Sequence, residues 1–342
     1  MKIIPTLKTI LLSQYFRVGV SIALLSVLFQ WIDLNSFVNS ITTANPYYLL
    51  TAVILMTANR ILMPLKWNLL LRSHNLFLNW KDSVKIYYVS TFFGLFLPAT
   101  VGADTLRTIY TKQRGISVEH GLASIMVERV LGALTTLTFG LLGGVLFILY
   151  FTQEQSDLSK LLSIALALLF FFIATFYLTL TTKFANFADH IAETMQNKGT
   201  LGSIIKALHK LYSAYALYRD RKGTMFIFIL LTIIETAMPV IWSWLVALSI
   251  GINDVELIYY CTFVPLILLL IRLPISLDGF GINEGAYVYF LTLVGVSTSA
   301  AFSVGFITHI LFLACLLPGI LIYLLSSSEF SSPKKPEVRE TN

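Results

Sequence analysis

Long apolar runs, several of them reaching the roughly twenty residues that a helix needs to cross a bilayer, follow one another along most of this 342-residue chain. Charged residues make up only 12% of it, whereas they make up about 25% of an ordinary soluble domain. Backbone inside lipid must satisfy its own N–H and C=O groups, which helices do within one segment. The sequence therefore predicts an all-α, polytopic membrane protein.

Six of these runs are predicted to cross the membrane completely, and two more are interrupted. The predicted spans are 15–32, 47–70, 119–151, 158–182, 223–250 and 299–326. The interrupted segments are 84–110 and 256–297.

Both interrupted segments carry the same kind of break. The first reads LPATVGAD over 97–104 and the second reads LPISLDGFG over 273–281, so each follows Leu-Pro with a hydroxyl residue, a glycine and a carboxylate. Non-helical backbone at membrane depth is tolerated only where protein buries it or where it lines a wet cavity. A matched pair of such breaks in the two halves of a chain points to the binding site of a transporter.

The distribution of Lys and Arg predicts the topology. With the N-terminus in the cytoplasm, Arg17, Lys66 and the basic segment 183–222 all fall on the cytoplasmic side, as the positive-inside rule requires. This arrangement holds only if both interrupted segments dip into the membrane and return. We therefore expect about six transmembrane helices plus two re-entrant helical hairpins entering from opposite faces, compatible with an inverted pseudo-repeat, and both termini in the cytoplasm.

One membrane domain is expected over 1–326, followed by a disordered cytoplasmic tail over 327–342 that is rich in Ser, Pro and Lys. Apolar residues recur at helical spacing within 183–222, which predicts one or two amphipathic helices. Two interpretations of this segment stay open. It lies on an anionic leaflet, or it is a connector packed on the helical bundle.

Ionisable residues at membrane depth point to a polar interior. Each costs about 2.5–3.5 kcal/mol to insert, so such residues usually face a ligand or ion path. The alternative is that buried Arg–carboxylate pairs simply join helices. The residues concerned are Arg60, Glu128, Arg129, Glu235 and Arg272 in or beside apolar runs, with Asp104, Arg107, Asp278 and Glu284 at the breaks.

The breaks themselves suit an anionic ligand. Half-helix N-termini present free N–H groups and partial positive charge, which bind phosphate and carboxylate. Gly102, Gly279 and Gly281 would let the backbone approach such a ligand closely. Together with the arginines, these features predict that the ligand is a lipid with an anionic phosphate head group.

Three motifs give the chain a family resemblance: FFGLFLPATVGADTLR over 92–107, SIMVERVLG over 124–132, and LPISLDGFGINEG over 273–285. In their order and spacing the chain resembles the lysylphosphatidylglycerol synthase transmembrane-region family, also called flippase-like domain proteins. The resemblance implies a protein of the bacterial or archaeal cytoplasmic membrane that moves a lipid or lipid-linked sugar between leaflets. It places the family's motif positions on Pro98, Gly102, Asp104, Arg107, Glu128, Arg129, Pro274, Gly279, Gly281 and Glu284.

Two departures from the family pattern are visible. Ala103 stands where the family often has a second glycine, so its methyl group restricts backbone approach there. Bifunctional relatives also carry a soluble aminoacyl-transferase domain after the membrane part. Only sixteen residues follow Ser326 here, so we do not expect lysyl transfer.

The predicted function is translocation of an anionic phospholipid or a polyprenyl-phosphate-linked lipid. The sequence has no Walker-type phosphate loop, so transport is expected to be passive or coupled to a proton or ion through Glu128, Glu235 or Asp104. The alternatives are a membrane-embedded glycosyl or phospho-group transferase and an accessory scaffold of an envelope-lipid pathway. No cofactor, metal site or nucleic-acid partner is expected, because two isolated cysteines and five scattered histidines show no ligand spacing.

The predicted substrate-binding residues combine these arguments in one set. They are Arg60, Pro98, Gly102, Asp104, Arg107, Glu128, Arg129, Glu235, Arg272, Asp278, Gly279, Gly281 and Glu284.

Overall fold

The computed structural model describes residues 7–97, 99–151, 181–195, 199–273 and 275–326, with isolated positions between 163 and 179. All regular elements in this part are helices: thirteen α-helices and one short 3-10 helix. In chain order they are α1 (Leu7–Gln30), α2 (Leu34–Thr42), α3 (Pro46–Arg72), α4 (Trp80–Gly94), α5 (Ala99–Lys112), α6 (Val118–Phe151), α8 (Thr182–Met195), α9 (Gly199–Ala216), η1 (Leu217–Asp220), α10 (Lys222–Ser249), α11 (Leu257–Leu270), α12 (Ile282–Thr292), α13 (Thr298–Ala314) and α14 (Pro318–Leu325).

Within the described residues, four helical stretches are long and apolar enough to cross a membrane, which makes the chain a polytopic membrane protein. They are Pro46–Arg72, Val118–Val145, Lys222–Ser249 and Thr298–Leu325, the last formed by α13 and α14 together. A fifth span is present if the bent pair Tyr15–Gln30 and Leu34–Thr42, which turns by 98°, counts as one. More than half of the predicted span 158–182 and the whole of the predicted tail 327–342 lie outside the described residues.

The second interrupted segment loses its helical structure at the predicted place, whereas residues 99–104 of the first predicted break are helical and belong to α5. α4 ends at Gly94 and α5 begins at Ala99, while α11 ends at Leu270 and α12 begins only at Ile282. The second break contains left-handed backbone, with φ of 48° at Asp278, 87° at Gly279 and 82° at Gly281. Such angles end a helix, and Asp278 is strained there because it has a side chain.

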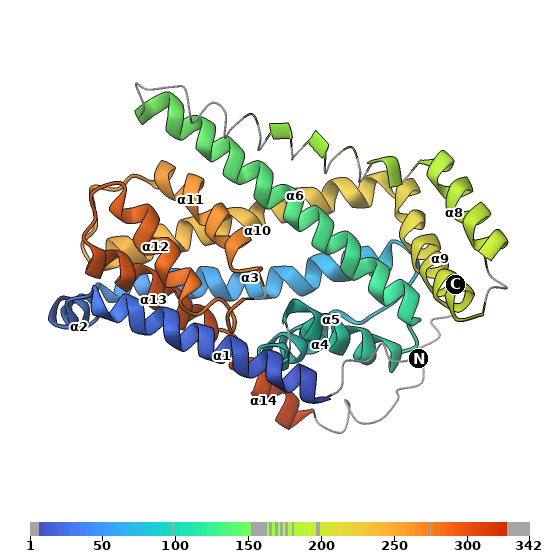
Figure 1. Cartoon of the computed structure of the whole chain (residues 1–342), viewed down its shortest axis with the longest axis horizontal. Coiled ribbons are helices and arrows are strands. Elements are labelled where there is room, and N and C mark those ends of the chain that lie inside the picture. The colour runs from blue at the N-terminus through green and yellow to red at the C-terminus, as the bar shows by residue number, and fades with distance from the viewer. Residues whose placement is uncertain are drawn as a thin grey trace.

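Two long helices form the centre of the bundle. α3 and α10 run side by side through the middle of the molecule, with α6 crossing over them towards α11 (Figure 1). The largest apolar core joins α3 and α10 to the three helices α11, α12 and α13. In it, Met56 and Val246 are buried with Tyr260, Leu291 and Phe302. The broken segments α4–α5 and α11–α12 therefore rest on a continuous helical scaffold.

The basic segment after the undescribed region folds as α8, α9 and η1. α9 packs against α6, and Tyr215 and Tyr218 are buried with Leu70, Val127 and Phe228. This contact favours the connector interpretation for α9. α8 still presents Phe184 and Phe187 as exposed side chains.

Close packing of α6 on α11 gives a first prediction. A Cβ at Gly143 would collide with the backbone carbonyl of Cys261 and lie 2.8 Å from the Cα of Thr262, whose hydroxyl donates to the Gly143 carbonyl at 2.8 Å. Gly143→Ala should therefore destabilise the protein by about 1–3 kcal/mol, since overpacked backbone must move apart. The readout is the melting temperature of the purified protein in detergent.

Gly132→Ala is the matched control in the same helix. No atom lies within 4 Å of the Cβ that it would add, so it should be neutral or stabilising by about 0.5–1 kcal/mol through helix propensity. Equal melting temperatures for the two variants would contradict the close α6–α11 contact.

Candidate functional site

A cavity of about 250 Å³ lies where the two broken segments meet. Its wall includes Leu97 and Asp104 from the first break, and Ser276 and Asp278 from the second. α1, α3, α6 and α13 contribute further side chains. The two breaks, distant in sequence, thus face one polar hollow.

The wall of this cavity is rich in positive charge. Among the described lining residues are five arginines and two aspartates: Arg17, Arg60, Arg107, Arg129, Arg272, Asp104 and Asp278. This excess of guanidinium groups suits an anionic ligand, because Arg presents a planar fork of donors to phosphate or carboxylate oxygens.

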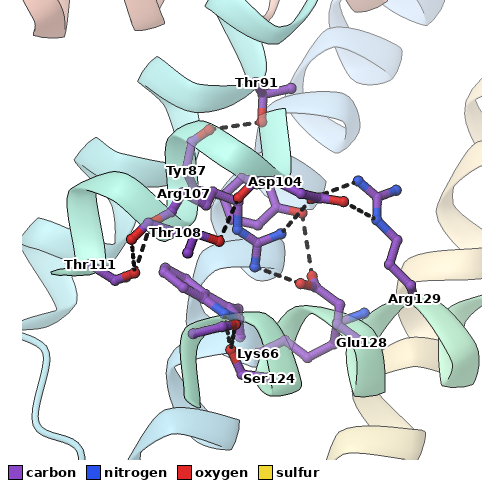
Figure 2. Close-up of polar contacts among 12 residues, drawn as sticks. Lys66, Tyr87, Thr91, Asp104, Arg107, Thr108, Thr111, Ser124, Glu128 and Arg129 are labelled. Atoms are coloured by element: carbon purple, nitrogen blue, oxygen red, sulfur yellow. Dashed lines mark hydrogen bonds and ion pairs between the residues drawn. The ribbon is translucent and has the colours of Figure 1, made fainter. Parts of the chain in front are cut away.

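Asp104 and Arg129 form a bidentate ion pair between α5 and α6 (Figure 2). The Arg129 Nη2–Asp104 Oδ1 distance is 2.9 Å and the Nε–Oδ2 distance is 3.1 Å. The Arg129 side chain remains 45% exposed. This pair therefore lies at the open side of the site and uses most of the acceptor capacity of Asp104.

Arg107 and Glu128 form a second pair, which is buried. The Arg107 Nη2–Glu128 Oε2 distance is 2.6 Å, and Tyr87 also donates to Glu128 at 3.4 Å. The Arg107 guanidinium lies 4.3 Å from the ring centroid of Trp67 and 4.5 Å from that of Tyr87. Figure 2 shows Arg107 between Glu128 and Asp104, so Glu128 balances the charge of Arg107 from behind the cavity wall.

The other three arginines have no carboxylate partner in the described part of the chain. Arg60 is only 5% exposed, its guanidinium lies 3.9 Å from the Phe312 ring centroid, and its Nη2 atom has no hydrogen-bond partner. Arg17, in α1, is also buried. The Arg272 guanidinium donates to the Thr136 hydroxyl at 3.5 Å, its one side-chain hydrogen bond to a described residue.

A buried histidine–carboxylate pair holds the second break. His309 Nδ1 lies 2.7 Å from Glu284 Oε1, and Glu284 Oε2 accepts from the Gly281 N–H at 2.6 Å. The other imidazole nitrogen lies 3.7 Å from Asp278 Oδ2. Glu284 has no exposed surface and caps the start of α12, so it supports the cavity wall without being part of it.

Glu235 lies away from the cavity wall as well. Its carboxylate forms an ion pair with Lys66, which is 1% exposed, and its backbone carbonyl accepts from the Asn59 side chain at 3.2 Å. These contacts join α10 to α3, which is a structural role.

The structure brings seven of the thirteen predicted site residues to the cavity wall. They are Arg60, Asp104, Arg107, Arg129, Arg272, Asp278 and Gly279. The described residues away from the wall are Gly102, Glu128, Glu235, Gly281 and Glu284, while Pro98 and the motif residue Pro274 lie outside the described residues.

Two predicted glycines have packing roles instead. A side chain at Gly102 would meet Leu97, and one at Gly281 would meet Leu24 of α1. Ala103, the departure from the family pattern, packs against Gly94 where α4 and α5 approach each other. Within the described ranges, no group of three His, Cys, Asp or Glu side chains is placed to hold a metal ion.

Sequence reasoning missed Arg17 as a cavity residue. The positive-inside rule predicts only that Arg17 lies on the cytoplasmic side, and the structure adds that it lies on the cavity wall. Its position inside the predicted span 15–32, four residues before Ser21, is the signal that could have identified it. Ser21 in turn accepts from the Leu277 N–H at 2.9 Å, so this face of α1 contacts the second break.

Comparisons with known proteins agree with the membrane architecture. The family described as "Lysylphosphatidylglycerol synthase TM region" matches residues 14–319. The UPF0104 membrane protein MJ1595 of the archaeon Methanocaldococcus jannaschii is 23% identical over 334 residues, which cover 95% of each chain. No solved structure matches the chain at a significant level.

Proposed function

The chain belongs to the lysylphosphatidylglycerol synthase transmembrane-region family, and we propose that it translocates an anionic phospholipid or polyprenyl-phosphate-linked lipid between the leaflets of a bacterial or archaeal cytoplasmic membrane. The observation that carries this proposal is the arginine-rich cavity between the two breaks. Charged groups at membrane depth are costly unless they serve a ligand or ion path, and here five arginines line one hollow.

The proposed topology is a single membrane domain over 1–326, with six spans and two re-entrant hairpins formed by α4–α5 and α11–α12. The hairpins would enter from opposite faces, with both termini in the cytoplasm. The common cavity supports this arrangement, because broken backbone inside a membrane must be buried in protein or line water. The basic segment containing α9 and η1 would then lie on the cytoplasmic side.

The rim of the cavity suits the lipid's acyl chains. Leu97 and Leu273, the leucines that precede the two prolines, line the cavity and are both exposed. An amphipathic substrate would place its head group among the arginines while its chains stay in lipid beside these leucines. Exposed apolar groups next to a polar hollow are what such a substrate requires.

Translocation can be measured in proteoliposomes with fluorescently labelled phosphatidylglycerol in one leaflet. We expect faster exchange between leaflets than in protein-free vesicles. Equal rates with and without protein, across anionic phospholipids and polyprenyl phosphates, would refute the proposal.

Arg129→Gln separates a translocase from an accessory scaffold. The change removes a charge from the cavity wall and frees Asp104, so we expect the exchange rate to fall at least tenfold. Because Arg129 is half-exposed, its loss should shift stability by about 1 kcal/mol or less. A scaffold would keep its function in this variant. Unchanged exchange by the folded variant would place Arg129 outside the transport path.

A further inference from the structure

We propose that Arg17, Arg60 and Arg272 form a phosphate subsite that prefers a phosphate monoester or diphosphate head group to a phosphodiester. The inference rests on the proposed function and specifies the charge of its substrate. It separates these three arginines from Arg107 and Arg129, which belong to the family's sequence motifs.

Three of the five arginines on the described cavity wall are available to a ligand. Arg107 is neutralised by Glu128 at 2.6 Å and Arg129 by Asp104 at 2.9 Å. The three subsite arginines have no ion pair with a described residue. The remaining carboxylate among the described wall residues is Asp278, which already lies 3.7 Å from His309. At least two positive charges therefore stay uncompensated in the cavity.

Two polar groups on the described cavity wall are buried and unsatisfied. Arg60 is 5% exposed, and its Nη2 atom has no partner among the described residues. Ser276, on the same wall, is also 5% exposed, and its hydroxyl has no partner in the same part of the chain. Buried polar groups of native proteins are nearly always satisfied, and an unpaired buried charge is strongly unfavourable. An anion in the cavity would satisfy both groups.

The charge and the volume of the cavity fit a phosphate monoester or a diphosphate. A phosphodiester head group carries one negative charge, whereas a phosphate monoester carries about 1.5 to 2 at neutral pH. Two uncompensated guanidinium charges therefore fit the monoester, or a diphosphate, more closely. The volume of about 250 Å³ lies below the roughly 300–1,000 Å³ of pockets for drug-sized ligands. It suits one or two phosphate groups and excludes a large oligosaccharide.

Phosphatidic acid and phosphatidylglycerol with identical short acyl chains provide a matched test. Each is titrated calorimetrically into the purified full-length protein in neutral detergent, with phosphatidylcholine as the zwitterionic control. We expect phosphatidic acid to bind at least tenfold more tightly than phosphatidylglycerol, and phosphatidylcholine to bind most weakly. Equal affinities for the two anionic lipids would overturn the proposal.

Inorganic diphosphate distinguishes a lipid subsite from a site for soluble anions. Displacement of phosphatidic acid by diphosphate would support a common phosphate subsite. Binding of diphosphate without any binding of phosphatidic acid would overturn the assignment to a lipid.

Substitutions test the three arginines individually. Arg17→Gln, Arg60→Gln and Arg272→Gln should each weaken phosphatidic acid binding at least tenfold and reduce the preference over phosphatidylglycerol. Arg60→Lys keeps the charge and should retain much of the preference, and Arg17→Gln and Arg272→Gln still test the subsite if Arg60→Gln does not fold. Arg219→Gln, on the exposed 3-10 helix η1, should change nothing. An unchanged preference in both Arg17→Gln and Arg272→Gln would refute the subsite.

The two proposals fail in different ways. Protein-dependent exchange of phosphatidylglycerol and phosphatidic acid at equal rates, with equal affinities, would remove the subsite and leave the translocase. Selective binding of phosphatidic acid without accelerated exchange of any lipid would leave the subsite and remove the translocase.

Discussion

Glu235→Gln should destabilise the protein by about 3–5 kcal/mol, the usual cost of leaving a buried charge without its partner. Lys66 is 1% exposed and Glu235 is its ion-pair partner among the described residues. The Lys66 ammonium group also lies 4.8 Å from the Phe228 ring centroid, so in the variant its charge would remain in a largely apolar surrounding. Because α3 and α10 form the centre of the bundle, we expect the melting temperature in detergent to fall by several degrees.

A double replacement shows whether the loss comes from the orphaned charge. Lys66→Met with Glu235→Leu removes both charges and retains apolar volume, so it should recover most of the stability. Glu193→Gln, on the exposed face of α8, is the control and should change stability by less than about 0.5 kcal/mol. A melting temperature in Glu235→Gln equal to that of the control would mean that Lys66 does not depend on this carboxylate.

Local sequence signals were enough to predict two of the long helices and the second break. The prediction for 119–151 corresponds to α6 over Val118–Phe151, and that for 223–250 corresponds to α10 over Lys222–Ser249. Span length and apolar content are properties of contiguous residues. The break at 273–281 could also be predicted from contiguous residues, because Gly279 and Gly281 adopt the positive φ angles that glycine favours.

Partners across helices could not be predicted in the same way. The positive-inside rule predicts a cytoplasmic side for Arg17 and Lys66, but it does not give the direction of either side chain. Glu235 and Glu284 were expected to bind substrate, whereas the structure pairs them with Lys66 and His309. These pairings depend on which helices pack together, and residue spacing along one helix does not contain that information.

Glu284 offers the sharpest contrast between a structural and a ligand-binding carboxylate. Glu284→Leu removes the acceptors for both the Gly281 N–H and His309. Each of the two buried groups left unsatisfied costs about 1–3 kcal/mol, so the variant should lose about 2–6 kcal/mol of stability. The cavity wall at Asp278 and Gly279 should also lose its fixed geometry, since Asp278 holds a strained φ of 48°. We therefore expect a lower melting temperature together with weaker phosphatidic acid binding.

Glu284→Gln is the matched control for this prediction. The amide oxygen can still accept from the Gly281 N–H, and the amide nitrogen can donate to a neutral His309. This variant should therefore keep most of the stability and most of the lipid binding. If Glu284 instead contacted the substrate, Glu284→Gln would lose lipid binding at an unchanged melting temperature, and Glu284→Leu would be no less stable than Glu284→Gln. That pattern would move Glu284 from the support of the second break into the binding site itself.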